Sequence, residues 1–250
     1  MSSFKSFLRA GHSPTLFAAF LYFCFSCCIW VLNGAMAPFI SETFSLTPAQ
    51  KGLMLSIPII AGALMRFPLG VLAQYIGRKN ATLVEMGLIA VAMLYGLFFV
   101  NEFNDLLAMG VLLGIAGASF GVALSLGSGW FPPQHKGLAM GLVGAGNVGT
   151  ALSVLVAPPL AQWLGWQAVY GVAAGAILLP MLVMVIWAKE PPDVDTHASF
   201  RSHIACLFEK DGWAFSLIYG VTSAASSAWR PSCPRTTSTS SASRRCRPGS

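Results

Sequence analysis

Six long stretches of this chain are almost free of charged side chains, and no other feature constrains the fold as strongly. A helix needs roughly 20 mostly apolar residues to cross the hydrocarbon layer of a bilayer. Each stretch reaches that length, and only Arg66 and Glu85 place a formal charge inside the six. The predicted spans cover residues 16–39, 52–77, 81–100, 106–130, 137–164 and 166–188.

The composition indicates the same class of protein. Apolar residues make up 55% of the chain, charged residues only 10%, and the mean hydropathy is +0.67. An ordinary soluble domain is about a quarter charged. Because a bilayer offers no water to backbone groups, single spans are expected to be helical. We therefore predict an all-α membrane protein in which residues 16–188 form a six-helix bundle, with no cleavable signal peptide.

Lysines and arginines gather in alternate connections between the predicted spans. Cytoplasmic loops carry an excess of these residues, so the connections that hold them are predicted to be cytoplasmic. This places residues 1–15 and the charged linker 189–211 in the cytoplasm of a multi-pass protein of the inner (plasma) membrane. The basic residues on this side are Lys5, Arg9, Arg78, Lys79, Lys136 and Lys189.

Arg66 lies near the middle of the second predicted span. An arginine at that depth costs about 2.5–3.5 kcal/mol even on a lenient insertion scale. Such a cost is tolerated when the guanidinium faces a polar cavity or a partner, and its planar fork of donors matches planar oxyanions. The sequence therefore predicts an anion site inside the membrane, with a structural ion pair as the alternative.

A second polar group, Asn147, lies among glycines in the fifth predicted span. Gly141 and Gly144, and again Gly146 and Gly149, are three residues apart, a spacing that lets membrane helices pack closely. A side-chain amide in mid-span needs hydrogen-bond partners. Asn147 is therefore predicted either to line a polar cavity or to bond a neighbouring helix.

The other conspicuous side chains have plainer interpretations. Glu85, near the start of the third span, is expected to form a structural charge pair with Arg78 and Lys79, with proton coupling as the alternative. The cysteines between residues 24 and 28 are expected to be packing residues, because no polar shell that supports a zinc site accompanies them. No catalytic constellation is visible, so we expect no enzyme activity, no metal and no cofactor.

Two blocks resemble known families. The connection after the second span, Gly70-x-Leu72-Ala73-x-x-x-Gly77-Arg78-Lys79, resembles the GxLADRxGRK loop motif of the major facilitator superfamily. Gln74 and Tyr75 replace the usual Asp and Arg, which implies a weaker or rebuilt charge network in that loop. Residues 130–153 resemble the nitrate signature of the nitrate/nitrite porter family. The matching positions are Gly141, Gly144, Gly146, Asn147 and Gly149.

This resemblance, over residues 16–222, implies a secondary transporter of nitrate or nitrite that works by alternating access between two six-helix halves. It implies that Arg66 is one of two arginines that grip the anion, that Asn147 contacts it or lines its cavity, and that Tyr219 contacts it. The expected partners are the anion and the lipid bilayer, with no nucleic acid. A transporter of another small anion is the alternative.

Residues 212–222 are predicted to begin a seventh helix, and residues 223–250, rich in Ser, Arg, Pro and Thr, to be a disordered tail. One added base before the codons of residues 223–229 allows them to read Phe-Gly-Gly-Phe-Val-Gly-Leu, a continuation of that helix. We therefore expect a frameshift and an incomplete, inactive half-transporter, with a non-functional remnant as the extreme case.

Overall fold

The computed structural model describes residues 6–8, 10–192, 213, 217–218 and 221. The chain divides into two units, Met1–Ala198 and Ser199–Ser250, and the account below concerns the first. The predicted seventh helix is described only at the four isolated residues above. Tyr219, most of the linker 189–211 and the predicted tail 223–250 lie outside the described residues.

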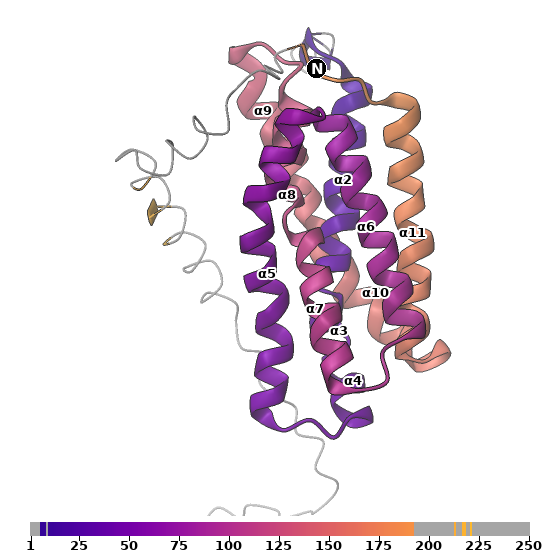
Figure 1. Cartoon of the computed structure of the whole chain (residues 1–250). Helices are drawn as coiled ribbons and strands as arrows, with labels where there is room; N and C mark the ends of the chain where they lie inside the picture. The colour runs from indigo at the N-terminus through magenta and orange to yellow at the C-terminus, as the bar shows by residue number, and fades with distance from the viewer. Residues whose placement is uncertain (1–5, 9, 193–212, 214–216, 219–220, 222–250) are drawn as a thin grey trace, which may run out of the picture. The chain divides into compact units, whose positions relative to one another are not determined.

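Within the described part of the first unit, six helical spans are long and apolar enough to cross a membrane (Figure 1). This confirms the predicted all-α membrane fold. Several spans are made of two or more helical pieces. The elements are α2 (Ser13–Trp30), α3 (Leu32–Ala35), α4 (Ala37–Thr43), α5 (Pro48–Tyr75), α6 (Arg78–Phe98), α7 (Phe103–Gly117), α8 (Ser119–Ser128), α9 (Pro133–Gly144), η1 (Ala145–Asn147), α10 (Val148–Leu164) and α11 (Trp166–Trp187).

Local chemistry explains where the helices begin. Thr47 and Gln50 form a capping box before α5, with Pro48 in its first turn. Gly77 and Gly165 precede α6 and α11 with positive φ angles of 89° and 84°. Glycine adopts such angles without a steric penalty, so both tight connections between consecutive spans are encoded at single residues.

The first predicted span differs from the structure. Residues 16–39 were expected to form one helix, but α2 ends at Trp30 and two short helices, α3 and α4, follow. Pro38 lies in the first turn of α4, where its missing N–H is harmless because first-turn amides have no intrahelical partner. A proline at this position favours a new helix start over a continuous span.

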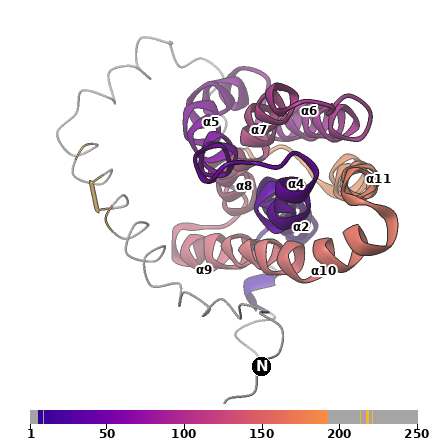
Figure 2. The ribbon, with the colours of Figure 1, turned by 90° about the horizontal axis from the view of Figure 1, so that it is seen from below.

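The bundle is arranged around α2. In the view along the helices, α2 lies in the middle, with α6 and α11 on one side and α9 and α10 on another (Figure 2). The helices α8, α10 and α11 all pack against it. Of an 18-residue apolar stretch in each span, 56% is buried in α2, against 22% in α5 and 28% in the α9–α10 span. The helices α5, η1 and α10 therefore carry the residues of interest on a more exposed part of the bundle.

Small residues hold α5 tightly against α7. A Cβ on Gly114 would collide with Ala61 and would lie 2.7 Å from the backbone nitrogen of Gly62. Nearby, Trp30 donates a hydrogen bond from Nε1 to the Pro58 carbonyl at 3.2 Å. Close backbone approach is the main packing device of membrane helices, and here it fixes one side of α5 while the other side stays open.

Candidate functional site: an open face with an uncommitted arginine

Arg66 lies on the exposed side of α5, nine residues before the helix ends at Tyr75. That distance corresponds to about 14 Å along the helix axis, at 1.5 Å per residue. Its neighbours Met65 and Phe67 are also exposed, by 37% and 43%, whereas Leu69 turns into the bundle. Arg66 therefore belongs to the face of α5 that other described helices leave uncovered.

The guanidinium of Arg66 has no hydrogen bond or ion pair with any side chain or carbonyl that the structure describes. It lies close enough to the thiol of Cys27, on α2, to interact with it electrostatically. Five N–H donors in a rigid fork thus remain available for a ligand. This disposition fits the predicted anion site better than the alternative of a structural ion pair.

Asn147 ends the single 3₁₀ turn η1, which joins α9 to α10. The side chain is exposed, and no described residue bonds its amide, while its backbone carbonyl accepts a hydrogen bond from Thr150 Oγ1 at 2.8 Å. The predicted helix-to-helix bond through this amide is therefore not present among the described residues. The exposed position agrees with the other interpretation, in which Asn147 lines a cavity.

The four glycines around Asn147 separate into two pairs. A Cβ on Gly146 would lie 2.9 Å from Phe23 Cδ1, and one on Gly149 would collide with the Cys24 carbonyl. By contrast, a Cβ on Gly141 or Gly144 would meet no described atom within 4 Å. The close helix packing expected of all four is thus found at Gly146 and Gly149, and the other two belong to the open face.

One turn of α2 connects these groups. Cys24 packs against Gly149 of α10, and a Cβ on Gly149 would also lie 3.2 Å from the Cys28 backbone nitrogen. Cys27, in the same turn, lies near Arg66. Arg66, on α5, and the glycine–asparagine segment therefore both lie near this turn of α2. The cysteines are free thiols.

The loop motif forms a clasp at the end of the bundle that carries the basic residues. Glu190 accepts hydrogen bonds from the backbone nitrogens of Arg78 at 2.6 Å and Lys79 at 2.8 Å. Gly77 is required there, because a Cβ would lie 3.1 Å from the Glu190 carboxylate and its φ is positive. A carboxylate at a helix N-terminus satisfies free amides and complements the helix dipole. Gly70, in contrast, has open space around it.

The side chains of the motif bind backbone carbonyls. Arg78 donates from Nη1 to Ser125 at 3.0 Å, and Lys79 donates from Nζ to Val185 at 3.1 Å and Ala188 at 2.7 Å. The expected charge pair of Glu85 with Arg78 and Lys79 is therefore wrong. Basic side chains near helix C-termini satisfy the last free carbonyls, and this geometry directs both residues toward α8 and α11 instead of Glu85.

His12 extends the clasp to the start of α2. Its Nδ1 and the hydroxyl of Thr15 are 2.7 Å apart, and the same hydroxyl accepts a hydrogen bond from the Lys189 backbone nitrogen at 3.0 Å. Partial burial, and to a lesser degree the positive charge of Lys189, lowers the pKa of His12. A neutral ring suits this position, because Nδ1 also accepts from the Thr15 amide at 3.3 Å.

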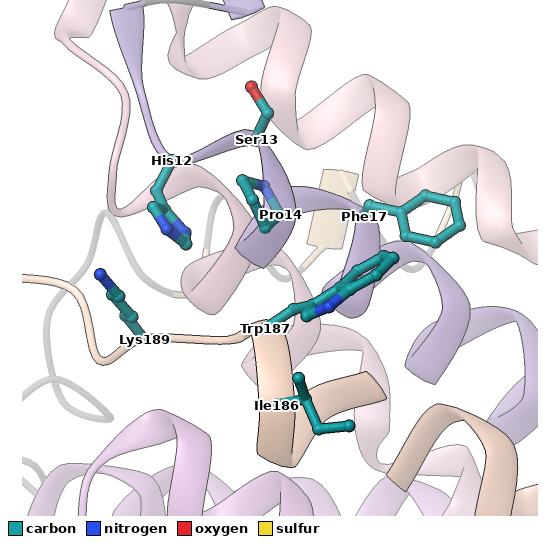
Figure 3. Close-up of a pocket in the computed structure, with 7 residues that line it drawn as sticks. All are labelled: His12, Ser13, Pro14, Phe17, Ile186, Trp187 and Lys189. Carbon is teal, nitrogen blue, oxygen red and sulfur yellow. The ribbon is translucent and has the colours of Figure 1, made fainter. Parts of the chain in front are cut away.

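An open pocket of about 480 Å³ lies beside the clasp, between the start of α2 and the end of α11 (Figure 3). Its walls include His12 and Lys189 on one side and the rings of Phe17 and Trp187 on the other. It is separate from the open face, since neither Arg66 nor Asn147 lines it. Aromatic and basic side chains together are typical of a membrane–water boundary.

Two contributors to these contacts could not be recognised from sequence. Glu190 stands in a charged linker, 112 residues from the amide that it binds. Tyr22, in the first span, donates a hydrogen bond to Glu85 across 63 residues. No local pattern marks either residue, because each acquires its role through a contact between distant helices.

No group of three or more His, Cys, Asp or Glu able to hold a metal lies in the described part of the chain.

Six apolar spans with α2 at their centre, and an exposed arginine within one of them, define a multi-pass helical membrane protein among the described residues. Residues 18–238 match the Major Facilitator Superfamily, and the chain belongs to this superfamily of transporters. Relatives from Staphylococcus aureus strains JH9, Newman and COL, each called "Probable nitrate transporter NarT", are 34% identical over 161 residues. The match covers 63% of this chain but only 40% of each relative.

Proposed function

We propose that this bundle supplies one wall of a nitrate or nitrite site in a secondary transporter of the plasma membrane. The N-terminus and the clasp lie on the cytoplasmic side, as the distribution of basic residues predicts. The observation that carries the proposal is Arg66, whose guanidinium is uncommitted on an exposed helix face at membrane depth. A charge in that place is costly unless it serves a ligand or a polar cavity.

Asn147, whose side chain is also exposed, contributes an amide donor and acceptor. Nitrate is planar, so a guanidinium fork binds two of its oxygens and an amide can bind another. The name of the relatives, which are 34% identical, supports nitrate as the substrate. Tyr219, outside the described residues, is proposed as a further contact by resemblance alone.

Alternating access requires a second bundle opposite this one, rocking around a shared site near the midplane. The described bundle leaves Arg66 on an open face, so we expect the 250-residue chain by itself to give no nitrate uptake. Expression in a host that lacks nitrate transport tests this directly. A second version, with the reading frame restored after Thr222, is expected to recover uptake. Robust uptake by the 250-residue chain alone would overturn the requirement for two bundles.

Arg66→Lys in the frame-restored protein tests the site. Lysine keeps the charge but lacks the planar fork, so we expect uptake to fall by at least tenfold while the amount of protein in the membrane is unchanged. Lys51→Arg, a charge-conserving change near the start of α5, is the matched control and should transport normally. Normal uptake by Arg66→Lys would assign Arg66 a structural role.

The arginine alone does not distinguish nitrate from other small anions. Competition in the same assay does so, because a planar oxyanion site should admit nitrite readily and exclude tetrahedral phosphate. Stronger competition by phosphate or chloride than by nitrite would favour the alternative, a transporter of another small anion.

A further inference from the structure

Glu85 is completely buried in the bundle, two turns into α6. Its Oε2 accepts a hydrogen bond from the hydroxyl of Tyr22, which is itself buried on the central helix α2. The next core residues of α6, Met86 and Ile89, are apolar and fully buried. The carboxyl group is therefore held between two membrane-spanning helices, away from lipid and from water.

The second carboxyl oxygen, Oε1, has no hydrogen-bond partner among the described residues. The nearest basic residues along α6 are committed elsewhere: Lys79 Nζ binds two carbonyls at the end of α11, and Arg78 Nη1 binds the Ser125 carbonyl. On α5, Arg66 is exposed and forms no ion pair with any described residue. No described cation pairs with Glu85.

The helices around α6 offer no other charge to compensate Glu85. Titratable residues on α2 near the pair are Tyr22 and Cys27. The sequence of α8 has none, and α7 has only Asp105, whose carboxylate caps its own helix start. The one titratable residue of α11, Tyr170, touches α6 near Gly96, at the other end, and donates to Asn33 at 2.6 Å. The remaining titratable side chains of α5, Lys51 and Tyr75, lie near its two ends.

An ionised carboxylate in such a place would be a buried charge with one hydrogen bond and no counter-ion. Its desolvation would cost far more than burial of the neutral acid with the same single partner. A neutral carboxyl can also donate a hydrogen bond as well as accept one. We propose that Glu85, together with Tyr22, forms a proton-binding site in the bundle and holds a proton as the neutral carboxylic acid.

Two further buried polar residues share the face of α2 that carries Tyr22. Thr15 and Ser26 are separated from Tyr22 by seven and four residues, a spacing that places all three on one face of the helix. All three are completely buried, and Ser26 Oγ, like Glu85 Oε1, has no partner among the described residues. The proton site thus lies on a polar face of α2, whereas Cys24 on another face contacts Gly149. The proposal for Glu85 does not depend on whether nitrate is the substrate.

Infrared spectroscopy of the purified 250-residue chain in detergent tests the proposal. The wild type at neutral pH should show the carbonyl stretch of a protonated carboxylic acid, and Glu85→Gln should lose that band. Tyr22→Phe should retain the band at a shifted frequency, because one hydrogen bond to the carboxyl is removed. Glu42→Gln, at an exposed carboxylate, is the matched control and should leave the band unchanged.

Thermal unfolding supplies an independent readout. Glutamine resembles a neutral carboxylic acid in shape and charge, so Glu85→Gln should keep the melting temperature of the wild type at neutral pH. A strongly destabilised Glu85→Gln would indicate an ionised carboxylate with a partner, and would overturn the proposal. An absent acid band in the wild type, or one unaffected by both Glu85→Gln and Tyr22→Phe, would do the same.

Discussion

The two faces of α2 meet very different surroundings. One face carries Tyr22 and Ser26, fully buried, and Tyr22 contacts Glu85 of α6. The other carries Cys24 and Cys28, which pack against η1 and α10 beside the open side of the bundle. Polar groups on the first face are enclosed by protein. The side chains of Arg66, on α5, and Asn147, on η1, are exposed and have no hydrogen bond or ion pair among the described residues.

Polar side chains inside a membrane bundle therefore serve two separate purposes. An enclosed polar group must find a protein partner or become neutral, as we propose for Glu85. A polar group on an open face can keep its charge and its free donors for a ligand. The residue type alone did not distinguish the two cases, because Arg66 and Glu85 are both ionisable side chains inside predicted spans, and only the packing around each shows which is exposed and which is buried.

The largest loss of stability is expected for Gly149→Ala, at the packed contact between α10 and α2. In Gly149→Ala, the new methyl group collides with the Cys24 carbonyl, a backbone atom that cannot move without displacing α2. Overpacking of this kind costs about 1–3 kcal/mol, so the melting temperature in detergent should drop clearly. Gly141→Ala is the matched control, since its methyl group meets no described atom and alanine favours the helix by about 1 kcal/mol. Equal stability of the two variants would refute the division of the glycines.

Asn147→Ala tests whether the exposed amide of Asn147 contacts the anion. Loss of one hydrogen bond to the anion, worth about 1 kcal/mol, corresponds to a roughly fivefold weaker apparent affinity for nitrate in the frame-restored protein. Ser119→Ala serves as the comparison, because Ser119 is buried and its hydroxyl bonds the Ala116 carbonyl at 2.8 Å. A larger transport defect in Ser119→Ala than in Asn147→Ala would remove Asn147 from the cavity.

Glu190→Gln tests the clasp, in which Glu190 binds the backbone nitrogens of Arg78 and Lys79 at the start of α6. Glu190 accepts from the Arg78 nitrogen at Oε1 and from the Lys79 nitrogen at Oε2. Glutamine has a single acceptor oxygen, so one of these two hydrogen bonds is lost together with the negative charge at the start of α6. We expect a loss of stability of about 1 kcal/mol, of which the electrostatic part is smaller at high salt. Thermal unfolding at two ionic strengths measures both effects. Glu42→Gln is the exposed control, and a loss of stability as large in that variant would count against a specific role for Glu190.

The smallest expected effect is a pH dependence from His12. Burial and Lys189 lower the pKa of His12 in the folded protein, so the unfolded chain binds a proton more readily than the folded one. This contribution to stability is present above the unfolded pKa of about 6.5 and is lost as the pH falls through the folded pKa. The melting temperatures of the wild type and His12→Asn should therefore converge on acidification, and parallel pH profiles would exclude His12 as the titrating group.

The helices themselves were largely predictable from the sequence. Length and hydropathy gave six spans, and Gly77 and Gly165 lie at the tight connections where a positive φ is required. The break of the first span after Trp30 was missed, because Pro38 only marks a later helix start and the residues before it remain apolar. The open position of Arg66 agrees with the anion site that its residue type predicts, but its lack of partners became visible only once the neighbouring helices were placed.

The sequence by itself determined that this chain forms membrane-spanning helices, since an apolar segment of spanning length has no other way to satisfy its backbone in lipid. It also supplied the superfamily, through the Gly77-Arg78-Lys79 loop and the match over residues 18–238. The tertiary structure decided the partners: Tyr22 for Glu85, Glu190 for the start of α6, and none among the described residues for Arg66. These contacts join residues 63 and 112 positions apart, and hydropathy, which is a local property, carries no record of which helices meet.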